Sequence, residues 1–280
     1  KKKNIPISVI NGRITKKSFK KWKILSKTAH KVFSKFDLIL TSNMESKNYF
    51  EELGGKNIFH FGNIKFLNKI NFEVVKNNNE NILKSKNLWC ATSTHYNEEK
   101  FCIKTHLKTK EKINDLLTII IPRHIERSEQ IKSLCLEHKL NAQIINKGDK
   151  IFNETDIAII NSFGVLPEYL KYARSALIGK SLLEKFDKDG GQNPILAAQM
   201  GCKIYHGPYI SNFDDIYMFL KDKNLSQEIS TIHNLSDNLI KDLKTKKNLD
   251  QSKDLFDKIG ETILEKTFKE IDNFLNYENL

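Results

Sequence analysis

Long apolar runs are missing from this chain, and so is any signal peptide. No stretch approaches the ~18 apolar residues that a membrane-spanning helix needs. The first residue is Lys1 rather than methionine, so we expect the chain to lack N-terminal sequence and any membrane anchor to lie upstream. Cysteines are few and far apart, at Cys90, Cys102, Cys135 and Cys202. Without CxxC or Cys/His spacing they predict a reduced, cytosolic protein with neither metal nor cofactor.

The charge is strongly unbalanced, with a net +12 over 280 residues. Such a balance favours polyanions, although lysine is plentiful throughout and much of the charge suits an ordinary solvated surface. Nucleic-acid binding needs clustered basic residues interleaved with exposed aromatics, and the sequence shows no such module, so we expect no nucleic-acid partner. The lysine-rich stretch from Lys16 to Lys35 is amphipathic, which fits either a membrane-surface contact or an ordinary surface helix.

Arginine is scarce: four of the 46 basic residues are arginine and 42 (46 minus 4) are lysine. Two of the four lie together in Pro122-Arg-His-Ile-Glu-Arg127, directly after the apolar run Leu116–Ile121. The run predicts a buried parallel strand, and ligands of open α/β sheets bind where such strands end. Since arginine holds a phosphate or carboxylate with a planar fork, this loop indicates an anionic ligand, with a structural salt bridge as the alternative.

Short apolar runs alternate with amphipathic segments, which predicts an α/β fold with parallel sheets and helical crossovers. The first part, residues 1–76, holds too few strands to be a complete domain. One helix is expected over residues 18–34, with Trp22, Leu25, Ala29, Val32 and Phe33 on one face. A polar stretch at 77–87 reads as a linker. Residues 88–235 then form a complete Rossmann-like unit, and residues 236–280 are helical without strands.

Four loops of the second unit carry unusual polar residues at expected strand ends: Ser93-Thr94-His95, Pro122 to Arg127, Asn161 to Val165 and Gly190-Gly191-Gln192-Asn193-Pro194. The first offers hydroxyls and amides suited to phosphate, or routine helix N-caps. The last has two glycines that let backbone approach a ligand, and Pro194 begins a helix. We expect all four loops to face one edge of one sheet.

Several motifs occur in order and together resemble the 3-deoxy-D-manno-octulosonic acid (Kdo) transferases, lipid A glycosyltransferases of the GT-B fold. They are Asn11-Gly-Arg13, Gly62-Asn-Ile-Lys-Phe66, Trp89-x-Ala-x-Ser-Thr-His95 with Glu98-Glu99, Pro122 to Arg127, Gly190 to Pro194, and Gly207-Pro208 through Asn212-Phe213. The resemblance extends from about residue 5 to residue 220. It implies two Rossmann-like domains, the N-terminal acceptor-side one incomplete (1–76) and the second (88–235) binding the nucleotide sugar.

The resemblance implies an inverting, metal-independent enzyme that moves Kdo from CMP-Kdo to a lipid A precursor in lipopolysaccharide biosynthesis. It would act as a peripheral protein at the cytoplasmic face of the bacterial inner membrane. By similarity, the residues that would hold CMP are Pro122, Arg123, Phe163, Gly164, Val165, Asn193, Pro194, Ile195 and Leu196. Further substrate contacts are expected from Ser93, Thr94, His95, His124, Arg127, Gly190, Gly191 and Gln192. Lys65 matches the lysine expected to stabilise the transition state, the alternative being a surface lysine.

The chain departs from the family pattern in three places. Phe163-Gly-Val165 stands where the family usually has Met-Gly-Glu, and Leu196 where it has Glu. The family's general-base glutamate lies upstream of the part that matches Lys1, so no residue here is assigned that role, and we expect this chain alone to be inactive in transfer. Two alternatives follow: a GT-B transferase using another nucleotide sugar, or a non-catalytic GT-B binding module.

Overall fold

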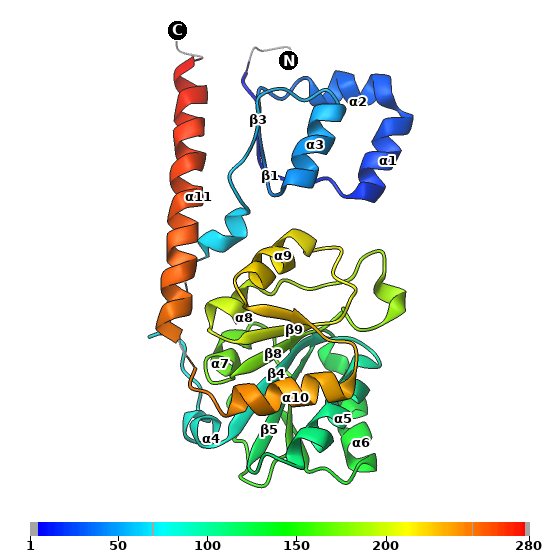
Figure 1. Ribbon diagram of the computed structural model, residues 1–280, viewed down its shortest axis with the longest axis vertical. Coiled ribbons are helices and arrows are strands. Elements are labelled where there is room, and N and C mark those ends of the chain that lie inside the picture. The colour runs from blue at the N-terminus through cyan, green and yellow to red at the C-terminus, as the bar shows by residue number, and fades with distance from the viewer. Residues whose placement is uncertain (1–4, 69, 248, 278–280) are drawn as a thin grey trace. The chain divides into compact units, whose positions relative to one another are not determined.

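The structure is a computed structural model that describes residues 5–68, 70–247 and 249–277 (Figure 1). Contacts divide the chain into two compact units. Unit 1 combines the described residues of 1–69 and 254–280, and unit 2 comprises 70–253. The sequence-based division instead ended its first part at residue 76 and treated 236–280 as a separate helical region. The difference at the C-terminus arises because the last helix packs against unit 1, as described below.

Unit 1 is built on a three-stranded parallel sheet in the order β1-β2-β3. Its elements in chain order are β1 (Ser8–Gly12), α1 (Lys16–Ile24), α2 (Ser26–Phe33), β2 (Leu38–Thr41), α3 (Met44–Glu52), β3 (Ile58–His60), the 3-10 turn η1 (Ile64–Leu67) and most of α11 (Leu249–Tyr277). Phe19, Phe33, Ile39 and Phe50 belong to one buried cluster, so the helices cover the apolar sheet. The expected parallel α/β organisation is confirmed for this unit.

The single helix expected over 18–34 is wrong, because the chain breaks at Leu25 into α1 and α2. Leu25 has φ −101° and ψ 44°, outside helical geometry. The break lets Phe19 of α1 and Ala29 of α2 both reach the core. Leu25 and Val32, expected on the buried face, are instead 58% and 39% exposed.

Helix α11 covers the turn that carries Lys65. The rings of Phe66 and Phe256 stack with centroids 6.0 Å apart. Gly62 has φ +123°, and a Cβ there would lie 2.6 Å from Cδ1 of Ile263, so this motif glycine lets the helix approach closely. The C-terminal helix therefore completes unit 1.

Unit 2 contains a seven-stranded sheet in the order β10-β9-β8-β4-β5-β7-β6, with every pair parallel. Its elements in chain order are α4 (Glu80–Ser85), β4 (Asn87–Thr94), α5 (Glu98–Lys110), β5 (Leu116–Pro122), η2 (Ile125–Arg127), α6 (Ser128–Glu137), β6 (Ala142–Ile145), β7 (Ile157–Ile160), α7 (Leu166–Leu170), β8 (Ser175–Ile178), η3 (Glu184–Phe186), α8 (Ile195–Gln199), β9 (Lys203–His206), α9 (Asp214–Asp222), β10 (Ser226–Glu228) and α10 (Ile232–Leu243). The expected Rossmann-like alternation is confirmed, whereas β10 was missed because its sequence, Ser-Gln-Glu, carries no apolar signal.

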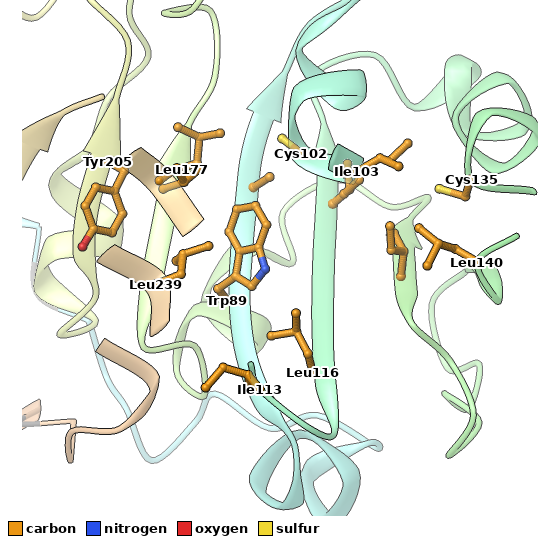
Figure 2. Packing of buried hydrophobic residues seen from close by; sticks show 14 of the residues in the cluster. Trp89, Cys102, Ile103, Ile113, Leu116, Cys135, Leu140, Leu177, Tyr205 and Leu239 are labelled. Carbon is orange, nitrogen blue, oxygen red and sulfur yellow. The ribbon is translucent and has the colours of Figure 1, made fainter. Parts of the chain in front are cut away.

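Both faces of this sheet are buried. Trp89, Cys90 and Ala91 follow one another along β4 and each has 0% exposure. Trp89 and Ala91 join a cluster with residues of α5, α6 and α10 (Figure 2). On the sheet, α7 packs against β4 and α8 against β9. Burial on both faces explains why these strands are continuous apolar runs.

The segment expected as a linker is ordered structure. Residues 80–85 form α4, and the Asn79 side chain joins two parts of unit 2: its Nδ2 donates to the Asp149 carbonyl at 2.9 Å, and its Oδ1 accepts from the Ile151 amide at 2.8 Å. Through Asn79, the asparagine-rich stretch is therefore hydrogen-bonded to the loop around residues 149–151 of unit 2.

Candidate functional site

The expected loops all follow carboxyl ends of strands in unit 2. Because these strands are parallel, their carboxyl ends share one edge of the sheet. Strand β4 lies between β8 and β5, so the chain runs outward from it on both sides. This switch point is the usual ligand position of an open α/β sheet.

We expected Ser93 and Thr94 at a helix start. The structure places them instead at the bulged end of β4. The register against β5 shifts between Thr92 and Thr94, and Ser93 has φ +53°. Gly179, at the end of β8, fits against this bulge: a Cβ there would lie 2.4 Å from the Ser93 carbonyl oxygen. Helix α5 begins only at Glu98.

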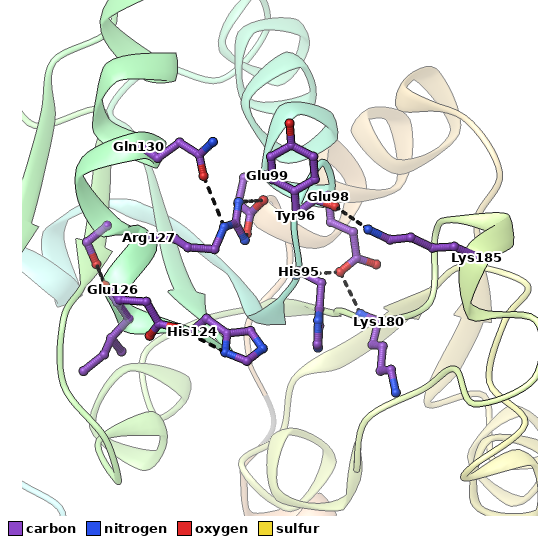
Figure 3. A network of polar contacts seen from close by, with 12 residues as sticks. His95, Tyr96, Glu98, Glu99, His124, Glu126, Arg127, Gln130, Lys180 and Lys185 are labelled. Carbon is purple, nitrogen blue, oxygen red and sulfur yellow. Dashed lines mark hydrogen bonds and ion pairs between the residues drawn. The ribbon is translucent and has the colours of Figure 1, made fainter.

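The carboxylate of Glu98 connects the loops after β4 and β8. Its Oε2 accepts from the amides of His95 at 2.9 Å and Lys180 at 2.7 Å. Its Oε1 accepts from Ser181 at 2.9 Å and Leu182 at 3.0 Å. Burial raises the pKa of Glu98, and the four amide hydrogen bonds oppose that rise. Glu98 therefore holds His95 and Lys180 in place (Figure 3).

The two arginines of the Pro122–Arg127 loop have different environments. Arg127 forms a bidentate ion pair with Glu99, with Nη1–Oε1 2.9 Å and Nη2–Oε2 3.1 Å, and Glu99 has a side-chain exposure of 1%. Its guanidinium also lies over the Tyr96 ring, 5.2 Å from the centroid. Arg127 thus makes the structural salt bridge that we kept as the alternative. Arg123 is exposed, and the described residues give its side chain no carboxylate partner.

His95 lies at the centre of a cationic cluster. Its ring makes edge contacts with His124, centroids 5.5 Å apart, and Phe186, centroids 5.4 Å apart. Burial lowers the pKa of His95 to about 4, and the nearby positive charges lower it further; these belong to His124, Lys180, Lys185 and Arg123. The imidazole is therefore neutral near pH 7, and its Nε2 is buried without a hydrogen-bond partner.

Carboxylates offset only part of this charge. Lys180 pairs with Asp189 at 2.9 Å, and His124 with Glu126 at 3.3 Å. Lys185 donates instead to the Tyr96 carbonyl at 3.3 Å, and its Nζ lies 5.0 Å from the Phe186 centroid. The cluster therefore keeps positive potential that suits an anion.

The glycines Gly190 and Gly191 pack against the protein's own backbone. A Cβ at Gly190 would lie 2.3 Å from the Tyr209 carbonyl oxygen, and Gly191 has φ +85° with its amide donating to the Lys180 carbonyl at 2.6 Å. Helix α8 is only five residues long, and Asn193 Oδ1 accepts from the Ile195 amide at 3.1 Å. The glycines thus join the loops after β8 and β9.

Burial separates the expected contact residues into three groups. Buried members, which shape the loops, are Thr94, Pro122, Val165, Gly190, Gly191, Pro194 and Ile195. Intermediate members are Ser93, His95, Arg127, Gln192 and Leu196. Exposed members, able to touch a ligand directly, are Arg123, His124, Phe163, Gly164 and Asn193. Phe163 is 68% exposed.

Lys65 lies in unit 1, apart in the chain from the other expected residues. It is exposed on turn η1, where Asn63 Oδ1 accepts from its amide at 3.1 Å. Asn11 Oδ1 accepts from the neighbouring Ile64 amide at 3.2 Å. This contact between Asn11 and Ile64, 53 residues apart, joins the two motifs into one local structure.

Sequence reasoning did not select Glu98 as an organiser, nor Lys180 and Lys185 as parts of the cluster. In the sequence, Glu98 was noted only as part of a family motif. Lys180 and Lys185 could not be distinguished among 42 lysines (46 minus 4). Within the described ranges, no three His, Cys, Asp or Glu side chains gather closely enough to hold a metal ion. The four cysteines are buried and unpaired.

Comparison with known proteins shows which family the chain is similar to. Residues 1–68 match the sequence model of the N-terminal part of 3-deoxy-D-manno-octulosonic-acid transferase (kdotransferase). The 3-deoxy-D-manno-octulosonic acid transferase of Rickettsia bellii is 30% identical over 217 residues, which cover 76% of this chain and 50% of that protein. The chain is thus a relative of the Kdo transferases. It spans about half the length of this curated relative.

Solved structures support the same fold class. The C-terminal CMP-Kdo binding domain of WaaA from Acinetobacter baumannii aligns with TM-score 0.54 and 21% identity, covering 65% of this Kdo transferase relative and 91% of that chain. Anabaena Alr3699/HepE in complex with UDP aligns with TM-score 0.52 and 11% identity, covering 94% and 72%. At these identities the likeness shows the fold alone, and it is the GT-B type that we expected.

Proposed function

We propose that this Kdo transferase relative takes part in moving Kdo from CMP-Kdo to a lipid A precursor, with inversion, in lipopolysaccharide biosynthesis. The proposal extends to peripheral association with the cytoplasmic face of the bacterial inner membrane. No described helix is both long and apolar enough to span a bilayer. In this scheme unit 2 binds the donor and unit 1 contributes on the acceptor side.

The observation that carries the proposal is the cationic cluster around His95. CMP-Kdo bears a phosphate and a sugar carboxylate, two anionic groups in one molecule. The cluster offers one guanidinium fork, at Arg123, together with the ammonium groups of Lys180 and Lys185. Since a fork binds phosphate or carboxylate bidentately, Arg123 is the contact we assign to the donor.

Departure of CMP leaves negative charge on its phosphate oxygens, and cations placed near them lower the barrier. We assign that role to Lys65 by its motif, and to the cluster by its charge. Acceptor activation needs a base near the attacking hydroxyl. We assign no residue of this chain to it.

A second candidate is a GT-B transferase that uses another nucleotide sugar. Val165 is 8% exposed and apolar, and Leu196 is half-buried, where the family has carboxylates. Without these carboxylates, contacts to the ribose would differ from those of the family. A non-catalytic binding module is the third possibility, and a binding experiment separates these three.

Calorimetric titration with CMP, UMP and UDP tests the proposal. CMP should bind this chain more tightly than either uracil nucleotide. Preference for UMP or UDP would favour the second candidate, and absence of binding to all three would favour the module without a donor site. Lys65→Ala should leave CMP affinity unchanged, because its proposed role is in transfer.

A further inference from the structure

The outward faces of α1 and α2 combine apolar and basic side chains. At the corner where the helices meet, Ile24 is 82% exposed and Leu25 is 58% exposed. On the helical wheel, residues 17, 21 and 24 lie opposite the core residue Phe19, and residue 20 lies about 100° from it. Residues 27 and 31 lie opposite Ala29 in the same way. Helices α1 and α2 follow one another at this corner (Figure 1). We call its surface the α1–α2 corner: Lys17, Lys20, Lys21, Ile24, Leu25, Lys27 and Lys31, all exposed.

The positive charge of the corner has little local compensation. The sequence contains no acidic residue before Asp37. Glu52 of α3 pairs with Lys23 at 2.9 Å, which offsets a lysine beside the corner rather than one of its five. The corner is therefore a concentrated basic surface around two exposed aliphatic side chains.

A cavity of about 330 Å³ lies beside the corner. Phe19 and Leu53 supply apolar walls, and Lys23, Lys27 and His30 supply basic ones, with Ser26 and Glu52 completing the lining. The His30 ring lies against Gly54, where a Cβ would be 2.4 Å from it. Apolar and cationic groups in one small cavity suit a ligand that is part hydrocarbon and part anion.

We propose that the α1–α2 corner docks this protein on a lipid bilayer that carries anionic headgroups. Ile24 and Leu25 enter the interface between headgroups and acyl chains, while the five lysines contact lipid phosphates. The neighbouring cavity accepts one headgroup. This inference deepens the proposed function by naming the surface that meets the membrane, and it is tested without nucleotide or transfer.

The corner combines positive charge with exposed apolar side chains, and this combination favours an anionic bilayer over other polyanionic partners. Single-stranded nucleic acid is bound by exposed aromatic rings on which bases stack. Of the aromatic rings on α1 and α2, Phe19 and Phe33 are buried, and Trp22 is half-buried and makes an edge contact with Phe33, centroids 5.1 Å apart. An acidic protein partner would match the lysines but gives no reason for an 82% exposed isoleucine at their centre.

The test is co-sedimentation of the 280-residue chain with vesicles of phosphatidylcholine, with and without phosphatidylglycerol. Wild-type protein should bind the anionic vesicles, and high salt should weaken binding. Lys17→Gln with Lys21→Gln should weaken binding about 25-fold, about fivefold for each lysine. Ile24→Ser with Leu25→Ser should weaken it at least about tenfold.

Matched controls lie on unit 2. Lys100→Gln with Lys104→Gln removes two exposed lysines with the same spacing on α5, and Val74→Ser removes a side chain that is 71% exposed. Both should bind vesicles as the wild type does. The substituted side chains are exposed, so circular dichroism should show unchanged folding.

Equal binding by the wild type and both corner variants would overturn the proposal. So would binding that does not depend on phosphatidylglycerol. If the lysine variant lost binding while the Ile24 and Leu25 variant kept it, the corner would be a general polyanion site, and membrane docking would be refuted. Calorimetry with CMP on the same variants is expected to show unchanged affinity, which separates failure here from failure of the proposed donor site.

Discussion

Arg127 and Glu99 form a bidentate ion pair whose two N–O distances are 2.9 and 3.1 Å, with the carboxylate almost fully buried. This pair fixes the loop after β5 to the start of α5. It also explains why two arginines of one loop lie in different environments: the Arg127 side chain holds the loop, and Arg123 is exposed at the surface.

Breaking the Arg127–Glu99 pair should therefore cost stability. Arg127→Lys or Glu99→Gln should lower the free energy of unfolding by about 2–4 kcal/mol, since either change leaves a buried group incompletely paired. Chemical denaturation measures this. Glu80→Gln is the control, because the Lys84–Glu80 pair is exposed and should contribute little to stability. Similar losses at both pairs would contradict the prediction.

Arg123→Lys should affect binding and leave stability unchanged. Loss of the planar fork should weaken CMP binding by about 1–3 kcal/mol, measured by titration calorimetry. Arg174→Lys makes the same chemical change elsewhere in unit 2, where the guanidinium donates to the Thr245 carbonyl, and CMP affinity should stay as in the wild type. If both variants bound CMP as the wild type does, Arg123 would have no part in the donor site.

Binding of an anion should add a proton to His95. Burial and neighbouring positive charges hold the pKa of His95 at about 4, and a bound phosphate would offset those charges and raise it. Between about pH 5 and 6, CMP binding should then take up protons. Calorimetry in two buffers of different ionisation enthalpy measures the uptake. His95→Asn should reduce it; equal uptake in the variant would assign the protons to another group.

His106 should make unit 2 sensitive to acid. Its ring is fully buried, with Nδ1 2.8 Å from Thr118 Oγ1, and burial lowers its pKa to about 4. Asp156 opposes this shift and Lys110 adds to it. Because the unfolded chain binds the proton more readily, stability is complete above about pH 6.5 and falls as the pH approaches 4, by about 3 kcal/mol.

The measurement is denaturant unfolding as a function of pH, followed by Trp89 fluorescence in a Trp22→Phe background. His106→Gln should flatten the profile between about pH 6.5 and 4. His233→Gln, at an exposed histidine of α10, should leave it unchanged. A profile that His106→Gln does not alter would show that other groups control the acid sensitivity.

Strands were the predictable part of this fold, because burial on both faces makes each one a continuous apolar run. The run Leu116–Ile121, predicted as a buried parallel strand, is observed as β5, Leu116–Pro122. The break at Leu25 was not predictable from periodicity, since apolar residues continue through it and only packing decides which of them are buried.

In the candidate site, the arginine loop was predictable because arginine is rare in this composition. The roles of Glu98 and Lys180 depend on contacts between segments 82 residues apart, which no local pattern records. The packing role of Gly190 likewise depends on the loop that follows β9. Residue type therefore indicated the candidate loop, while the partners of each side chain had to come from the structure.

The assignment of residues 254–280 to unit 1 has a practical consequence for dissecting the protein. Unit 2 is one uninterrupted piece of chain. Unit 1, which carries the Lys65 turn, consists of two pieces of chain separated by residues 70–253. A deletion that ends the chain near residue 253 would remove Phe256 and Ile263 from against Phe66 and Gly62. A C-terminal nonsense mutation would thus act on the Lys65 turn, although the end of the chain directly follows unit 2 in sequence.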